Sequence, residues 1–184
     1  GRRRPAGRTG LGSPLRRWLS GTRPPACGRG KKSTPAEEAI GRSRGGWTTK
    51  IHLRAEGQGK PVAFLLTPGE RHEISQAERL MQQGAVRRPS GQLRLYPKRV
   101  VGDKGYSFRP FRQFLHKKGI RNTIPTRSNQ PRHPSFDKEI YRQRNKVERL
   151  INRLKQFRRI ATRYEKRAAN YAAMLTLAMI LLWL

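Results

Sequence analysis

Residues 141–155 read YRQRNKVERLINRLK. Across residues 138–157, apolar side chains recur at the three- and four-residue spacing of one helix face. This spacing predicts a long amphipathic helix whose apolar face is buried. Four residues lie within roughly 60° of one another on the helical wheel, at the border between the apolar face and the arginine-rich face: Tyr141, Arg144, Glu148 and Lys155.

The position of Glu148 on this border allows two interpretations. A carboxylate with cations one or two turns away can hold a metal ion while the neighbouring cations contact phosphate groups. The alternative is an ordinary surface helix in which Glu148 forms an intrahelical ion pair. The helix alone favours the ion pair, so the choice depends on the rest of the sequence.

The charge of the chain predicts a polyanionic partner. It contains 42 Lys plus Arg against 11 Asp plus Glu, which gives a net charge of +31. Nucleic acid is the first candidate, because neutralisation of phosphates by Lys and Arg supplies most sequence-independent affinity. An anionic membrane surface or an acidic protein is the second candidate, and charge alone does not separate them.

Cysteine content and apolar runs exclude several classes of protein. Cys27 is the only cysteine, so no intrachain disulfide and no cysteine-based zinc site is expected. No secretory signal is recognisable at the N-terminus. The C-terminal run 168–184, AANYAAMLTLAMILLWL, is interrupted by Asn170 and Tyr171 and falls short of the roughly 20 apolar residues of a membrane span. We therefore expect a buried helix there, no membrane partner and a cytoplasmic protein.

The composition divides the chain into two parts. Residues 1–35 contain no Asp or Glu and are rich in Arg, Gly and Pro. Such a segment is predicted to be a basic, disordered arm, or a stretch translated from a wrong reading frame. Residues 36–184 carry the apolar patterning of one domain. The chain begins with Gly1 rather than Met, which suggests a fragment or a processed product.

The patterning of the second part indicates an α/β domain. The predicted elements are a hairpin of strands 48–55 and 62–66, a helix at 74–83, a strand at 99–102, a helix at 108–118, a strand at 120–125, and helices at 138–157 and 168–184. This order indicates a mixed sheet with helices on its faces. The strand at 99–102 places Asp103 at its C-terminal end, where catalytic groups commonly lie.

The four border residues resemble a family signature. Tyr141, two residues, Arg144, three residues, Glu148, six residues and Lys155 match the Y-(2)-R-(3)-E-(6)-K pattern of insertion-sequence DDE transposases. Four further segments are similar to the insertion-sequence-five type and follow in the same order: 41–50 (GRSRGGWTTK), 66–72 (LTPGERH), 101–106 (VGDKGY) and 154–164 (LKQFRRIATRY). The resemblance covers roughly residues 31–184.

This resemblance implies a function and a set of roles. It implies an RNase H-like fold that uses Mg²⁺ or Mn²⁺ to cut DNA at transposon ends and join it to a target, as an oligomeric transpososome at the bacterial nucleoid. Asp103 corresponds to the second metal-binding acid of the family and Glu148 to the third. Tyr141, Arg144 and Lys155 correspond to residues that contact DNA. For His72, local hydrogen bonding is the simpler expectation than a direct role in the site.

The chain departs from the family at the first acid, an Asp on the first strand. The sequence contains only Asp103 and Asp137, and the upstream acids Glu37 and Glu38 lie in a loop-like context. We therefore expect a missing first strand, a divided core, marginal folding and no DNA cleavage. The alternatives are a catalytically dead basic remnant that only binds DNA, and a generic RNA-associated protein.

Overall fold

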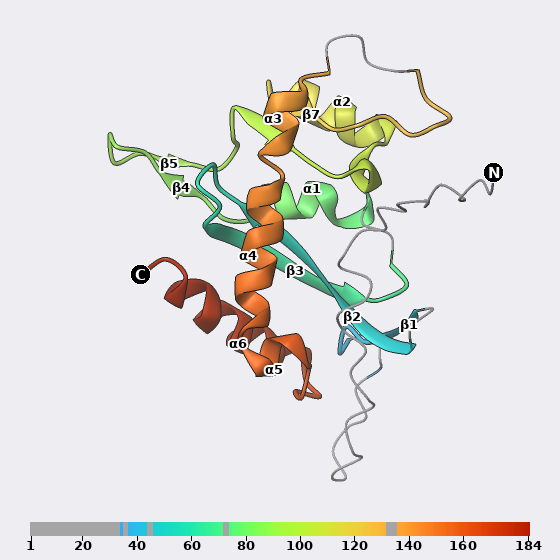
Figure 1. Cartoon of the computed structure of the whole chain (residues 1–184), viewed down its shortest axis with the longest axis vertical. Helices are drawn as coiled ribbons and strands as arrows, with labels where there is room; N and C mark the ends of the chain where they lie inside the picture. Colours follow the sequence, from blue (N-terminus) through green and yellow to red (C-terminus); the bar gives the residue numbers. More distant parts are fainter. Residues whose placement is uncertain (1–33, 35–36, 44–45, 72–73, 132–135) are drawn as a thin grey trace, which may run out of the picture.

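A long hairpin lies at the centre of the computed structural model, which describes residues 34, 37–43, 46–71, 74–131 and 136–184 (Figure 1). β2 (Gly46–Ala55) pairs antiparallel with β3 (Pro61–Pro68), as the alternation in the sequence predicted. The Glu56 carboxylate accepts main-chain N–H bonds within the connecting turn, and Gly59 adopts a φ of +91° there. β1 (Gly41–Ser43) pairs with only the first residues of β2.

A second, smaller unit follows the hairpin in sequence. β6 (Arg99–Val101) and β7 (Arg121–Thr123) are parallel, and the 3₁₀ helix η2 (Lys104–Tyr106) and α2 (Arg109–Lys117) connect them. The remaining elements before β6 are α1 (Ile74–Gln82) and a two-strand ribbon of β4 (Val86–Arg87) and β5 (Leu93–Arg94). The predicted helix at 74–83 is thus present, and the strands predicted at 99–102 and 120–125 occur as the shorter β6 and β7.

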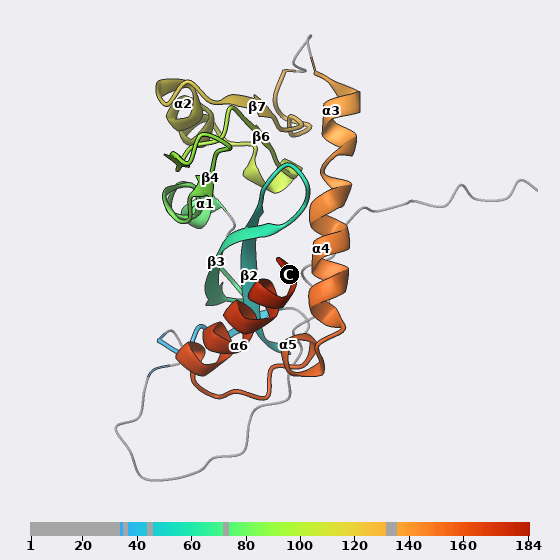
Figure 2. The same cartoon turned by 90° about the vertical axis from the view of Figure 1, so that its left-hand side faces the viewer.

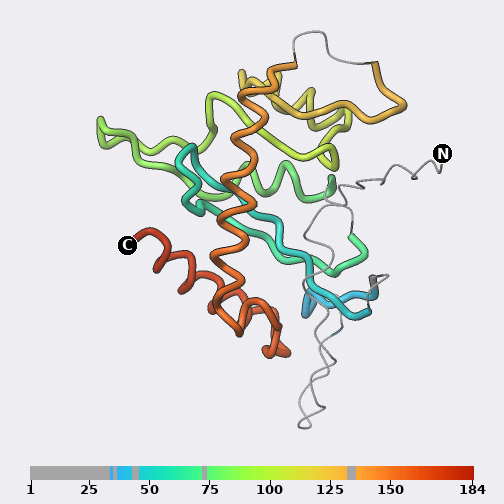
Figure 3. The backbone as a smooth tube through the Cα atoms, in the orientation of Figure 1, coloured from blue at the N-terminus to red at the C-terminus, as the bar shows by residue number. Residues whose placement is uncertain are grey.

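The helix predicted over residues 138–157 is divided in the structure. α3 (Lys138–Arg142) and α4 (Asn145–Lys155) are separated by one tight turn at Gln143 and Arg144. Hydrogen bonds three residues apart, from Lys146 N to Gln143 O and from Val147 N to Arg144 O at 3.0 Å each, replace the four-residue pattern there. Because the backbone stays right-handed, the two helices continue as one column beside both units (Figures 2 and 3).

The expectation of one mixed sheet is corrected. In the described part of the chain the strands form three separate sheets, β1-β2-β3, β4-β5 and β6-β7. One edge of β2 pairs with β3, and on the other edge β1 pairs only with residues 46–48. Residues 51–55 therefore have no strand partner on that other edge within the described ranges. The β6-β7 pair shares no ladder with the hairpin, because no described strand lies between them.

The apolar core consists of two clusters, in agreement with the expected divided core. The first packs one face of the hairpin against α4, α5 (Arg158–Ala161) and α6 (Ala168–Leu181), and contains Leu150, Leu154, Ile160, Tyr171, Leu175, Ala178, Met179 and Leu182. The second joins α1, α2 and the strand region of β6 and β7, and contains Ala77, Met81, Phe111, Leu115, Ile120 and Ile124. Arg54 links the two, since it donates to the carbonyls of Gln83 at 2.8 Å and of Leu95.

α6 is buried along one face and exposed along the other, so the expectation of a buried helix at 168–184 holds for one face only. Tyr171 and Leu175 are fully enclosed against the hairpin and α5. Leu177 and Ile180 on the outer face are more than half exposed, because no described element covers that side. None of the helices in the described ranges has the length and apolar content needed to cross a membrane.

A buried arginine anchors α6 to the beginning of the domain. Arg163 donates hydrogen bonds to the main-chain oxygens of Glu38 at 2.7 Å and of Ala39 at 3.3 Å. Its guanidinium also lies 5.1 Å from the ring centre of Tyr171. The Glu38 carboxylate accepts the N–H of Ala168 at 2.6 Å, at the first turn of α6. Glu38 therefore stabilises the N-terminal end of α6.

Candidate active site

Asp103 lies directly after β6, at the position where the sequence placed it. Its carboxylate accepts the N–H of Lys104 at 2.7 Å and so begins the 3₁₀ helix η2. Asp103 is only partly buried. Tyr106, at the end of η2, packs against Phe111 of the second cluster with ring centres 6.3 Å apart. A structural role for Tyr106 follows from this contact.

Glu148 lies in the first turn of α4 and is paired with Arg144. Glu148 Oε1 is 2.8 Å from Arg144 Nη2, and the two side chains keep 33% and 25% of their exposure. The intrahelical ion pair that the sequence left open is therefore present. An ion pair that remains about a third exposed contributes at most about 1 kcal/mol to stability, so it leaves the carboxylate available to other ligands.

Tyr141 connects Asp103 with the Arg144–Glu148 pair. Burial raises the pKa of the Tyr141 phenol above its ordinary value, nearby Arg144 opposes this rise, and the carboxylates of Asp103 and Glu148 add to it. Both carboxylates are therefore close enough to act electrostatically on one hydroxyl group. The Arg144 guanidinium lies 5.6 Å from the centre of the Tyr141 ring. Four of the five predicted site residues thus belong to one group, which joins the end of β6 to α3 and α4.

Lys155, the fifth predicted residue, lies further along the helix. It follows Glu148 by seven residues, which is roughly 10 Å along a helix axis. Its ammonium group donates to Asn152 Oδ1 at 3.3 Å, and burial lowers its pKa. Lys155 can therefore contact a long ligand that also reaches Glu148, but it does not belong to the acidic group itself.

The donors in this group fit part of a divalent-metal site. No cluster of three or more His, Cys, Asp or Glu side chains able to hold a metal occurs among the described residues. Mg²⁺ is held in proteins through one or two carboxylates, with water and phosphate oxygens completing its octahedron. Asp103 and Glu148 are carboxylates of the type that binds such an ion. A two-metal arrangement would require a further carboxylate.

A basic pocket beside this group was not anticipated from the sequence. It has a volume of about 980 Å³ and lies over α2, β7 and the segment leading into α3. Its charged lining consists of Arg99, Arg109, Arg112, His116, Lys117, Arg121 and a single acid, Asp137. One signal was available, because residues 104–136 contain no Asp or Glu. The pocket itself depends on how α2 packs against β7, and the absence of acids from this segment does not predict that packing.

Two other predictions concern residues that the structure does not describe. His72 lies outside the described ranges, as does the segment 1–35 except for Thr34. The division of the chain at residues 35 and 36 therefore stays a prediction.

Comparisons with known proteins agree with the signature carried by α3 and α4. The family model of the transposase DDE domain matches residues 18–183. A protein named as a transposase for insertion sequence element IS6501 of Brucella ovis is 30% identical over 141 residues, which cover 74% of this chain and 98% of that protein. One named for element IS402 of Burkholderia cepacia is 30% identical over 130 residues, covering 70% and 59%. No solved structure matches the chain.

The chain belongs to the transposase DDE domain family, which is a family of enzymes. The family identified from the spacing of Tyr141, Arg144, Glu148 and Lys155 is thereby confirmed, together with the α/β class of the fold. The match begins at residue 18, upstream of the point near residue 31 where the resemblance becomes recognisable in the sequence.

Proposed function

We propose that this chain is the catalytic domain of an insertion-sequence transposase, which cuts DNA at the ends of its element and joins those ends to a target. The observation that supports this proposal is that Asp103 and Glu148, from distant segments, both act on the Tyr141 phenol, while Arg144 pairs with Glu148. The net charge of the chain favours phosphates as ligands of such a group. Members of the family use divalent ions, and Mg²⁺ or Mn²⁺ is the proposed cofactor.

The residues of the group have distinct roles in this proposal. A divalent ion at Asp103 and Glu148 would supply Lewis acidity toward phosphate oxygens. Arg144 holds Glu148 in place and presents its remaining N–H donors to the DNA backbone. Tyr141 stays a neutral phenol because its pKa is raised, so it can donate a hydrogen bond to a phosphate. Lys155 contacts the DNA one to two turns further along the helix.

We further propose that the domain is an RNase H-like fold that lacks its first strand. Two unpaired edges support this proposal. Residues 51–55 of β2 and the outer edge of β6 have no strand partner in the described part of the chain. A strand between them would join the three-stranded sheet to the β6-β7 pair and unite the two core clusters. In the family that strand carries the first acid.

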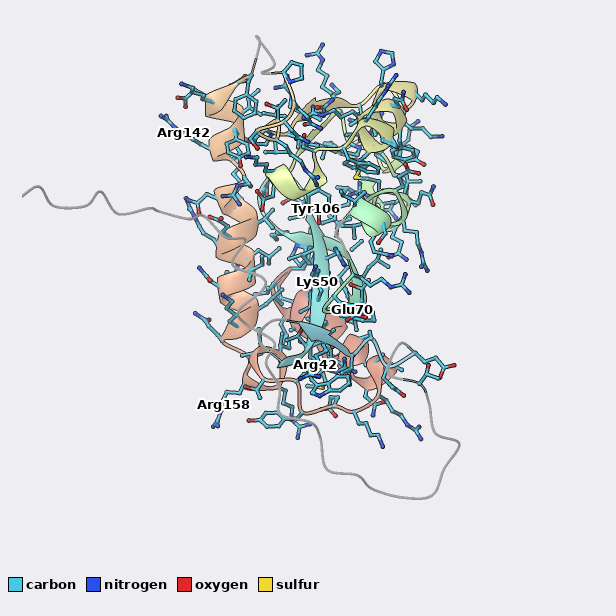
Figure 4. The ribbon with its side chains drawn as sticks, turned by 90° about the vertical axis from the view of Figure 1, so that its right-hand side faces the viewer. Arg42, Lys50, Glu70, Tyr106, Arg142 and Arg158 are labelled. Atoms are coloured by element: carbon cyan, nitrogen blue, oxygen red, sulfur yellow. The ribbon has the colours of Figure 1, made fainter. Side chains whose placement is uncertain are left out.

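This gap predicts that the chain binds DNA without cutting it. Asp103 and Glu148 provide two carboxylates, whereas the two-metal chemistry of the family relies on three. The alternative function is a basic remnant that binds DNA through its arginine-rich surface alone. The outward-pointing Arg142 and Arg158 near the two ends of the α3–α5 column show how such a surface would be formed (Figure 4).

A cleavage assay tests the proposal. The full chain is incubated with DNA carrying the ends of its own insertion sequence, in Mg²⁺ or Mn²⁺, beside Asp103→Asn and Glu148→Gln. We expect specific binding to these ends, weakened by Glu148→Gln or Asp103→Asn in a metal-dependent manner, and no cutting. The matched control is Glu139→Gln, which removes an exposed acid paired with Arg142 on α3.

Three other outcomes would change the conclusion. Cutting that Glu148→Gln abolishes and Glu139→Gln preserves would refute the inactivity but support the assigned residues. Cutting that survives Glu148→Gln would refute the assignment of Glu148. Binding without preference for the element ends would favour the basic remnant. We place the intact enzyme in an oligomeric complex on DNA at the bacterial nucleoid, which analytical ultracentrifugation of the protein–DNA complex would examine.

A further inference from the structure

The basic pocket is a hollow formed by three parts of the chain. α2 contributes Arg109 and Arg112, β7 contributes Arg121, and the segment before α3 contributes Phe136. The strands here are short, so the walls consist largely of long side chains. The pocket is concave, in contrast with an ordinary solvated arginine surface, which is flat or convex.

The charges in the pocket are not balanced by the protein. Asp137 is its only acid, and Asp137 Oδ2 lies 3.9 Å from Arg99. Arg109 and Arg121 are exposed, and within the described residues neither forms an ion pair. Cations gathered in a hollow without matching carboxylates repel one another, and this repulsion is relieved when an anion binds.

Arg112 fixes the base of this hollow. Its guanidinium donates to Asn122 Oδ1 at 2.7 Å, to Ser107 Oγ at 3.1 Å and to the carbonyl of Ile124 at 2.8 Å. All three acceptors are neutral, so the guanidinium is held rigidly while its charge remains uncompensated. Burial accordingly lowers the pKa of Arg112 from its ordinary value. A rigid cation at the base makes the positive field of the pocket a permanent feature.

An aromatic contact joins the pocket to the candidate active site. Phe136 lines the pocket, and its ring centre lies 5.3 Å from that of Tyr141. The next residue, Asp137, accepts the N–H of Ile140 at 2.9 Å and begins α3. A strand of DNA held near Asp103 and Glu148 would therefore pass Tyr141 and Phe136 before reaching Arg109 and Arg121.

We infer that this pocket binds the backbone phosphates of a DNA strand that continues from the site at Asp103 and Glu148. Arg109 and Arg121 contact the phosphates, and Phe136 offers a ring on which a base can stack, a combination typical of single-strand binding. The inference rests on the proposed function, since it assumes that DNA occupies the neighbouring acidic group. It concerns binding, and it applies whether or not the chain cuts DNA.

The test measures binding of the full chain to a short single-stranded DNA by fluorescence anisotropy, in EDTA, over a series of salt concentrations. The pocket variant is Arg109→Ala with Arg121→Ala, and both side chains are exposed, so the fold should persist by circular dichroism. We expect affinity to fall about tenfold and the slope of log K against log salt to fall by about 1.4, from two lost phosphate contacts. Phe136→Ala should weaken binding of single-stranded DNA more than that of duplex.

The matched control removes two exposed arginines from the ribbon of β4 and β5, Arg87→Ala with Arg88→Ala. An equal loss of DNA affinity in this control would overturn the inference, because removing any two arginines would then weaken binding to the same extent. A pocket-dependent loss confined to an RNA of the same length would also overturn it. If the wild-type chain binds no DNA at all, the proposed function fails as well. If the wild-type chain binds DNA and the pocket variant binds it equally well, the inference fails but the proposed function does not.

Discussion

His52 shows how a single side chain can make stability depend on pH. It is 2% exposed on the hairpin face turned toward α1, and its Nε2 lies 2.9 Å from Thr67 Oγ1. Burial, and to a lesser extent the charge of Lys50, lower its pKa from 6.5 to about 4. At neutral pH the ring is therefore neutral in the folded chain.

The first prediction follows from this shift. On acidification the unfolded chain takes up the proton near pH 6.5, whereas folded His52 takes it up near pH 4. Stability should therefore fall as the pH decreases across this window, by up to about 3 kcal/mol. Denaturant unfolding of the wild type and of His52→Gln at several pH values measures this contribution as the difference between the two curves. An identical pH dependence in both proteins would show that His52 contributes nothing.

The site residues differ in how far the sequence reveals them. Glu148 and Arg144 are neighbours on one helix, so local periodicity predicts that they lie together, and the ion pair at 2.8 Å agrees. Asp103 was identified through its position at a strand end and a short family motif. The proximity of Asp103 to Tyr141, and that of Phe136 to the same ring, depend on how α3 packs beside β6. No local pattern contains this information.

At the level of elements, the turn after α1 depends on a glycine. Gly84 follows α1 with a φ of +73°, and a Cβ at this position would lie 2.8 Å from the carbonyl oxygen of Val62 in β3. Both the left-handed backbone and the close approach exclude a side chain. This turn also carries carbonyls that accept hydrogen bonds from Arg54, so it helps to connect the hairpin with α1.

The second prediction is that Gly84→Ala destabilises the protein. The left-handed conformation alone costs an L-residue about 1–2 kcal/mol, and the contact with the Val62 carbonyl adds to this cost. Gly57→Ala is the control, since a Cβ there meets nothing within 4 Å and its φ is not in the left-handed region. Equal unfolding midpoints for the two variants in urea would contradict the argument.

The longer elements were predictable, and the two-residue strands were not. The hairpin, α1, α2 and α6 extend over enough residues for their apolar period to be recognised, although their ends differ by up to three residues from the prediction. The two-residue strands β4 and β5 are too short to show an alternation. The break between α3 and α4 contains no Pro or Gly, so the sequence has no helix-breaking residue that would predict it.

At the scale of the whole molecule, the divided core predicts separable stability. Leu115 in the second cluster and Leu175 in the first are both fully buried. Replacing either with Ala should cost about 2–5 kcal/mol locally. Because the described strands form no ladder between the two parts, we expect Leu115→Ala to expose the amides of α2 and β7 while those of α6 stay protected.

Hydrogen exchange followed by mass spectrometry measures this third prediction, and Leu175→Ala is the reciprocal control. The wild type should also unfold over a broad range of temperature, with circular dichroism and intrinsic fluorescence giving different midpoints. One sharp transition at high temperature, with both variants losing protection everywhere, would mean that the two clusters act as a single cooperative core.

The order of strands in the sequence does not determine which strands pair with one another. The sequence predicted the strands β2, β3, β6 and β7, but it also suggested that they share one mixed sheet. The unpaired edges of β2 and β6 show that they do not within the described residues, since pairing between distant strands requires a neighbour in the right place. The RNase H-like topology therefore stays a proposal.

The free edge of β2 also governs how the protein behaves in concentrated solution. The main-chain groups of residues 51–55, which have no strand partner on that side in the described part of the chain, can hydrogen-bond to the same edge of another copy, which is the first step of aggregation. The net charge of +31 keeps copies apart at low ionic strength, but the repulsion is screened within about 10 Å at 0.1 M salt. The high salt used to remove nucleic acid from a basic protein thus also screens the repulsion that opposes aggregation. The salt concentration should therefore be lowered before the protein is concentrated.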